Sequence, residues 1–198
     1  LPVNYGCADP TVTGCEQRIR LFFGTNDGIF HMVRNTNNSS GAEEGDEIGG
    51  FIPHSSLDLA SILSGGPTIP THPYGMDGRP VSLIVDNDND GHIESGDNDK
   101  VYLYITMRRG GDEVFAFDIS NPDIPPKLIW KINSASSDFT ELGMTFSNPT
   151  VGVVQTGVQS DAAGGAVELQ TAVVFAGGMC GGWNATNTAR LCKDLDGH

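Results

Sequence analysis

The residues best suited to chemistry in this chain form one short acidic stretch, residues 86–97. Gly91 stands at the sixth of its twelve positions, where a sharp turn is needed, and the apolar Ile93 is expected to pin the loop to the fold beneath it. The order of residues matches the calcium loop of an EF-hand, although strand-like segments flank it here. The candidate ligands are the side chains of Asp86, Asp88, Asp90, Glu94 and Asp97 and the backbone carbonyl of His92.

The chemistry of this loop favours a hard divalent cation. Ca2+ takes roughly six to eight oxygen ligands, and the loop offers oxygens without nitrogen or sulfur. Two like charges about 4 Å apart repel by about 1 kcal/mol even in bulk water, so we expect a loop that is loose without Ca2+ and ordered with it. Asp97 stands where the longer Glu is usual, so the pattern does not predict high affinity. The alternative is an Asn/Asp/Gly turn that bonds only its own backbone.

Length and composition predict a folded, acidic domain. The chain has 198 residues, 38% of them hydrophobic, and a formal net charge of −14. That charge argues against a nucleic acid or an anionic membrane as partner, because both need a cationic surface. No apolar run approaches the roughly 18 residues of a membrane span, and no signal peptide opens the chain.

The cysteines suggest an oxidising compartment. They fall in two local pairs without the CxxC spacing of a metal site or the CxxCH of a haem site. Three connectivities are possible, and we favour the local one, which places the chain outside the cytosol. Four buried free thiols are the alternative. The two expected disulfides join Cys7 to Cys15 and Cys180 to Cys192.

The rest of the chain reads as strands joined by tight turns. A hairpin is predicted at 25–28, a polar loop over 35–50, a turn at 108–112, and one short helix within 51–63 that begins near Ser55 or Ser56. The expected strands cover residues 19–24, 29–33, 81–85, 101–107, 114–119, 128–132, 151–155 and 169–176.

A weak repeat with an offset of 69 positions relates residues 81–107 to residues 151–176. Repeated hairpins with long inserts predict an all-β fold, a partial β-propeller of four-stranded blades over 19–198 after a disulfide-clipped lead-in at 1–18. A β-sandwich is the alternative. Asp194 and Asp196 in the last residues are expected to form an ordinary turn and not the start of a second cation loop.

Five ordered segments between residues 19 and 155 resemble the C-terminal propeller of the PilC/PilY family, the proteins associated with the tip of type IV pili. Each segment is a weak motif by itself, and their shared order makes the resemblance fairly specific. Arg79 stands where the family commonly has Ser. The segments are RLFFGTNDGIFH (20–31), FIP (51–53), YGMDGRP (74–80), GGDEVFAFDISNP with LIW (110–122 and 128–130), and LGMTFSNP (142–149).

The resemblance implies a calcium-binding propeller that acts in pilus assembly, retraction control and surface adhesion, and that is not an enzyme. It implies type IV pilus minor pilins or a tip complex as partners, together with a surface ligand whose identity the sequence does not give. It also implies an extracytoplasmic location, at the cell surface or pilus tip. Residues 109–112 do not form an Arg-Gly-Asp motif, so integrin binding does not follow.

Two other functions remain open at this point. Quinoprotein dehydrogenases are also periplasmic, calcium-dependent propellers, but no two cysteines are adjacent here, and the acidic loop leaves no open face for a quinone. A cell-surface interaction module unrelated to pili would need the same loop only as a structural element. The five histidines have neither a nucleophile-elbow serine nor an HExxH partner, so hydrolase chemistry is not indicated.

Overall fold

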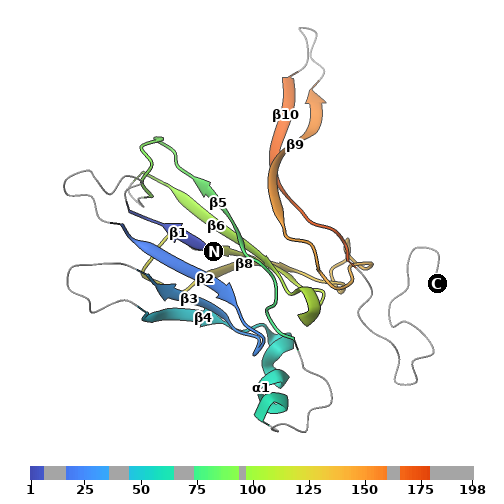
Figure 1. Cartoon of the computed structure of the whole chain (residues 1–198). Coiled ribbons are helices and arrows are strands. Elements are labelled where there is room, and N and C mark those ends of the chain that lie inside the picture. The colour runs from blue at the N-terminus through green and yellow to red at the C-terminus, as the bar shows by residue number, and fades with distance from the viewer. Residues whose placement is uncertain (7–16, 36–44, 65–73, 94–96, 160–165, 179–198) are drawn as a thin grey trace.

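The computed structural model describes residues 1–6, 17–35, 45–64, 74–93, 97–159 and 166–178. Antiparallel strands dominate these residues, with a single α-helix among them (Figure 1). The chain is therefore all-β, as the sequence predicts. Two sheets have four strands each, in the order β1-β2-β3-β4 and β5-β6-β7-β8, and β9 pairs with β10 in a third, two-stranded sheet.

In the first sheet each strand pairs with its neighbour in the sequence. The predicted hairpin at 25–28 is confirmed, because β2 and β3 pair in antiparallel register on either side of it. Gly28 in this turn has a φ of +91°, a left-handed conformation that glycine adopts without strain. The strands are β1 (Pro2–Asn4), β2 (Ile19–Gly24), β3 (Phe30–Arg34) and β4 (Glu47–Phe51).

The prediction of a loop over residues 35–50 is wrong at its C-terminal end, where β4 pairs with β3. The polar and glycine-rich composition of this segment conceals the strand. Its apolar Ile48 and Phe51 pack against the buried core. Pro125 lies where a Cβ on Gly49 would be, so only glycine allows this close contact. Tertiary packing thus overrides a weak strand propensity.

The second sheet is another antiparallel meander, and its strands lie within about one residue of their predicted bounds. A 3-10 turn, η2 (Arg108–Gly110), joins its two central strands, as the sequence predicts for 108–112. The strands are β5 (Val81–Val85), β6 (Lys100–Thr106), β7 (Val114–Asp118) and β8 (Lys127–Ile132).

The two four-stranded sheets pack face to face, and aromatic rings fill the space between them. The ring of Phe30 on β3 stacks on that of Phe117 on β7, with 5.2 Å between centroids. Phe51 meets the rings of Phe115 and Phe117 edge-on. Burying each such ring contributes roughly 1.5–3 kcal/mol, so this interface is a main source of stability.

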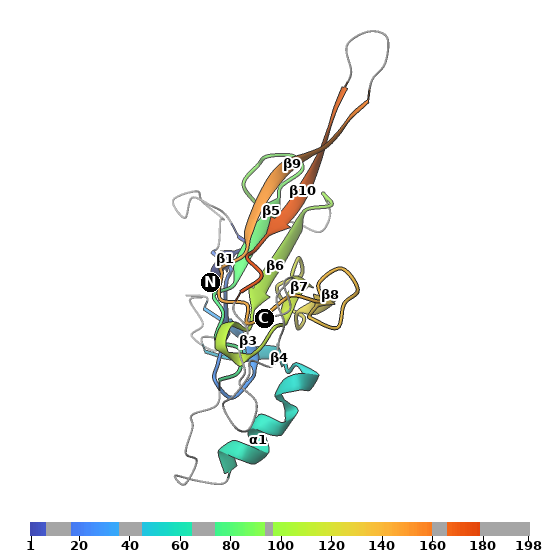
Figure 2. The ribbon, with the colours of Figure 1, turned by 90° about the vertical axis from the view of Figure 1, so that its right-hand side faces the viewer.

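Two smaller elements extend from this core. The predicted helix is confirmed as α1 (Leu57–Ser64), preceded by a 3-10 turn, η1 (His54–Ser56). The hairpin of β9 (Thr150–Gln159) and β10 (Ala166–Val174) projects away from the sheets at the end opposite α1 (Figure 2). Several of its apolar side chains are exposed, including Val153, Leu169 and Val174.

The junctions between successive sheets are built in the same way. The N–H of Met76 donates to the carbonyl of Thr25 in the preceding hairpin at 2.9 Å, and the N–H of Thr145 donates to the carbonyl of Gly111 at 3.2 Å. Met76 and Thr145 lie 69 positions apart, which is the offset of the sequence repeat. The two donors are therefore related by the offset of the repeat, whereas their acceptors, Thr25 and Gly111, lie 86 positions apart.

Candidate metal centre

The acidic loop connects two neighbouring strands of the second sheet. The register of β5 and β6 sets Val85 opposite Lys100, so the two ends of the loop are held side by side. Ile93 packs against the buried core, which confirms its predicted role of pinning the loop to the fold. Its position and its charge make this connection the leading candidate for a site.

Three carboxylates of this connection converge. Oxygens of Asp86, Asp88 and Asp99 all lie within 4.8 Å of one another. Ca2+ binds oxygens at about 2.3–2.6 Å, so two ligands on opposite sides of one ion are about 5 Å apart. The spacing and the all-oxygen donor set therefore fit a single hard cation. The residues present fit Ca2+, although the arrangement does not by itself identify the ion.

Asp86 shapes the turn of the loop. Its Oδ1 accepts the N–H of Asn89 at 2.7 Å, and its Oδ2 accepts the N–H of Gly91 at 2.9 Å. Asn89 and Gly91 both have a positive φ, 58° and 81°. Glycine adopts this conformation readily, and asparagine tolerates it. The backbone thus curls around the first carboxylate of the loop, as expected of its sixth-position glycine.

Asp99 is the functional candidate that sequence reasoning missed. It lies two residues beyond the twelve-residue pattern and is 2% exposed. Its Oδ1 accepts the N–H of Asn87 at 2.9 Å, and the Asn87 side chain donates to the carbonyl of Asn98 at 2.7 Å. One feature of the sequence could have identified Asp99. It is an aspartate directly before an apolar strand, where an unpaired charge would be costly.

Two of the other predicted side-chain ligands lie outside this cluster. Asp90 lies outside the three-carboxylate cluster, and its Oδ1 accepts the N–H of His92 at 2.8 Å. Asp97 is exposed, and its carbonyl accepts the Asn87 side chain at 3.4 Å. Glu94 is outside the described residues. A complete ligand set drawn from these residues remains a prediction.

Repulsion among the acids is visible at Asp88. The pKa of this carboxyl is raised above its ordinary value. The N–H of Asp90, the largest single influence, lowers the pKa, but desolvation, the charges of Asp90 and Asp97 and the contact with Asp86 together outweigh it. The neighbouring acids thus disfavour the charged form of Asp88, and a cation bound beside it would favour that form.

Several other predictions fall on residues that the structure does not describe. These are the cysteine pairs and the acidic tail at 194–196. Among the described residues, no helix is long and apolar enough to cross a membrane.

Comparison with known proteins identifies relatives. No protein-family model matches the chain. The type IV pilus biogenesis factor PilY1 of Pseudomonas aeruginosa (strain UCBPP-PA14) is 32% identical over 147 residues, which cover 73% of this chain and 11% of the relative. The crystal structure of the P. aeruginosa PilY1 C-terminal domain matches 76% of this chain and 28% of that one, at 26% identity and a TM-score of 0.43. The chain therefore spans about a tenth of its curated relative, and on the sequence match it belongs to the PilC/PilY family.

Proposed function

We propose that this chain is a calcium-binding segment of a β-propeller that acts, without catalysis, in type IV pilus biogenesis. The observation that carries the proposal is the convergence of Asp86, Asp88 and Asp99 in a member of a pilus biogenesis family. Pilus assembly, control of retraction and surface adhesion are the processes in which we place it. Minor pilins or a tip complex are the proposed partners.

The propeller proposal is supported by the repeated sheets. Two four-stranded antiparallel meanders pack face to face, and the backbone donors at the two junctions between sheets, Met76 and Thr145, lie 69 positions apart. In a propeller each four-stranded blade buries its two faces against the neighbouring blades. The hairpin of β9 and β10 corresponds to β5 and β6 in the repeat, so we interpret it as the first half of a third blade.

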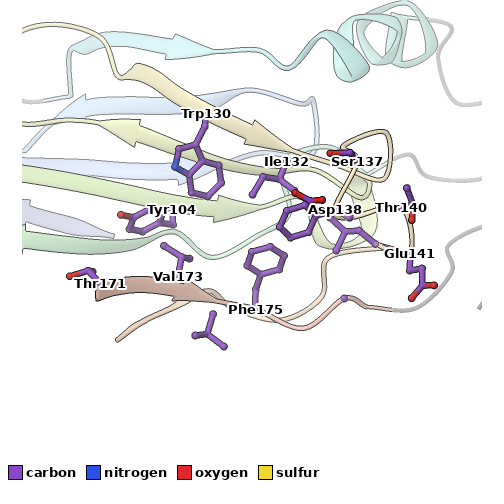
Figure 3. Close-up of a pocket in the computed structure, with 14 residues that line it drawn as sticks. Tyr104, Trp130, Ile132, Ser137, Asp138, Thr140, Glu141, Thr171, Val173 and Phe175 are labelled. Carbon is purple, nitrogen blue, oxygen red and sulfur yellow. The ribbon is translucent and has the colours of Figure 1, made fainter. Parts of the chain in front are cut away.

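A cavity between the second sheet and this hairpin agrees with that interpretation. It has a volume of about 820 Å³. Tyr104, Trp130 and Ile132 line it from the sheet, and Val173 and Phe175 face them from the hairpin (Figure 3). Polar side chains, among them Asp138, Thr140 and Glu141, line the cavity as well. Blades of a propeller pack against one another through their faces, so we propose that further strands of the third blade fill this space.

The proposed role of the ion is to hold the loop between β5 and β6 in one conformation. Asp86, Asp88 and Asp99 would hold it, and a bound Ca2+ supplies positive charge that offsets their mutual repulsion. Asp99 leads directly into β6, and Ile93 packs on the core, so the state of the loop is coupled to the blade. Calcium would thereby fix the blade edge that faces a partner.

The proposed location is extracytoplasmic, at the cell surface or pilus tip. The relative is a pilus biogenesis factor by name, and the two proposed disulfides, Cys7–Cys15 and Cys180–Cys192, suit an oxidising compartment. The strong negative charge of the chain also suits a medium in which millimolar divalent cations are available.

The proposal is tested in the complete parent protein. Asp86→Asn combined with Asp88→Asn, introduced into a strain that lacks the native protein, is expected to reduce surface pili and twitching motility. Asp112→Asn is the matched control, because Asp112 also accepts a backbone N–H, from Ser134 at 2.9 Å, and lies outside the acidic loop. Normal piliation by the double variant in calcium-containing and calcium-depleted medium would contradict the proposal.

A further inference from the structure

Three arginine side chains converge on the carboxylate of Asp123. Arg18 forms an ion pair with its Oδ2, Arg20 lies 3.3 Å from its Oδ1, and Arg34 lies 4.0 Å from the same Oδ1. Nε of Arg20 also donates to the carbonyl of Pro122 at 2.8 Å. Asp123 belongs to the connection between β7 and β8, so this arginine cluster joins the two four-stranded sheets.

The strand register places these positive charges side by side. Arg20 on β2 lies directly opposite Arg34 on β3. Like charges directly opposite one another destabilise a strand pair. Arg18 is two residues from Arg20, so the extended chain sends both side chains to one face. This pairing of like charges is unexpected in a chain that has 11 Lys and Arg against 25 Asp and Glu. Such a departure from the local rules of strand pairing is typical of functional sites.

The single negative charge of Asp123 does not balance the positive charges around it. Arg18 and Arg20 alone carry two positive charges. The pKa of Arg20 is lowered, first by burial and then, against the favourable contact with Asp123, by repulsion from Arg18 and Arg34. Arg18 and Arg20 thus share one carboxylate, so a second anion beside the exposed Arg18 would be attracted.

The cluster has one buried arginine and a solvent-exposed part. The side chain of Arg20 is 2% exposed, whereas those of Arg18 and Asp123 are 47% and 44% exposed. A partner group can therefore reach Arg18 from solvent while Arg20 holds the array in place. The planar guanidinium fork matches carboxylates, and Asp123 shows that a carboxylate fits this array.

We propose that the arginine cluster is a docking site for a carboxylate group on an acidic segment of a partner protein. The net charge of the chain is −14, so the cluster is a local exception to an overall field that repels such a segment. Asp123 occupies part of the site and competes with the incoming carboxylate.

Calorimetric titration of the 198-residue chain with a tri-glutamate peptide tests the proposal. We expect binding that is about tenfold weaker in Arg18→Gln, which corresponds to about 1.4 kcal/mol for one charge-assisted contact. Arg109→Gln is the control, because Arg109 is an arginine that contacts Tyr74 away from the cluster, and its variant should bind like the wild type. No binding, or equal binding by wild type and Arg18→Gln, would overturn the proposal.

Asp123→Asn separates docking from a purely structural ion pair. Removing the internal competitor should tighten binding of the peptide several-fold, and the peptide should raise the melting temperature of this variant more than that of the wild type. A purely structural cluster would lose stability without any gain in affinity, which would overturn the proposal. Tighter binding of inorganic phosphate than of tri-glutamate at equal ionic strength would overturn the assignment to carboxylates.

Discussion

The backbone N–H of Asn87 donates to the buried carboxylate of Asp99 at 2.9 Å. This hydrogen bond spans the acidic connection from its second residue to the residue that precedes β6. Asp99 thus closes the loop in the place where the twelve-residue pattern puts Asp97. The same carboxylate lies beside Asp86 and Asp88, so a cation bound there would contact the group that closes the loop.

Asp99→Asn should separate these two roles. Asparagine keeps an oxygen that accepts the Asn87 N–H but removes one negative charge. We expect calcium affinity to fall by about tenfold or more, because a charged ligand is lost. The melting temperature without calcium should stay the same or rise, because repulsion among the acids is reduced. Calorimetry and thermal unfolding measure the two effects, and unchanged affinity would show that Asp99 is not a ligand.

Asp123 predicts how stability depends on pH. Desolvation raises the pKa of this carboxyl, but the contacts and charges of Arg18 and Arg20 outweigh it, so the pKa lies below the ordinary 3.8. A lowered pKa contributes stability that is present in full above the unfolded-state value and is lost as the pH falls through the folded-state value.

The comparison of wild type with Asp123→Asn measures this contribution. The wild type should be the more stable at neutral pH, and the difference should shrink as the pH falls below about 4. Chemical unfolding at a series of pH values follows it. A difference that stays constant down to full protonation would mean that the ionised carboxylate contributes nothing.

Lys131 neutralises a buried carboxylate. Its Nζ lies 2.8 Å from Oε1 of Glu113, whose side chain is 6% exposed, and Ser55 donates to the other oxygen at 2.5 Å. Lys131→Met leaves this charge without its cation, so we expect a loss of about 1–3 kcal/mol in the free energy of unfolding. Lys127→Met on the same strand is the exposed control and should be nearly neutral. Equal unfolding midpoints for both variants would contradict this account.

Gly110 is required at the junction of β6 and β7. A Cβ there would lie 1.7 Å from the carbonyl oxygen of Gly75, whereas a Cβ at Gly152 would meet nothing within 4 Å. Gly110→Ala should therefore cost about 1–3 kcal/mol, because the backbone must shift. Gly152→Ala should be neutral or slightly stabilising, since it reduces the freedom of the unfolded chain. Urea unfolding compares them, and a neutral Gly110→Ala would show that this junction is loosely packed.

Much of the fold could be predicted because its strands are apolar and its turns carry specific residues. Val81–Val85 and Ile19–Gly24 have their predicted bounds, since each is an apolar run between turn residues. β4 could not be predicted, because a strand rich in glycine has no such signal. It forms by pairing with β3 and by packing of Gly49 against Pro125, which is remote in the sequence.

The candidate site was predicted in part for a related reason. The alternating acids and Gly91 report local turn chemistry, so Asp86 and Asp88 could be identified from spacing alone. Asp99 enters the site because β5 and β6 pair and bring the far end of the connection back to its start. A pattern of residues within the loop cannot show which residues the pairing of β5 with β6 brings together. The arginine cluster likewise depends on the packing of two sheets and had no sequence motif.

Calorimetric titration of the chain with Ca2+, set beside Asp86→Asn, tests the central claim most directly. We expect one saturable site in the wild type, an affinity at least about tenfold lower in the variant, and a weaker response to Mg2+, which demands a stricter geometry. At a hundredfold excess over its dissociation constant, Ca2+ should stabilise the fold by about 2.7 kcal/mol. Equal and negligible heats in both proteins, with no change in melting temperature, would contradict the account.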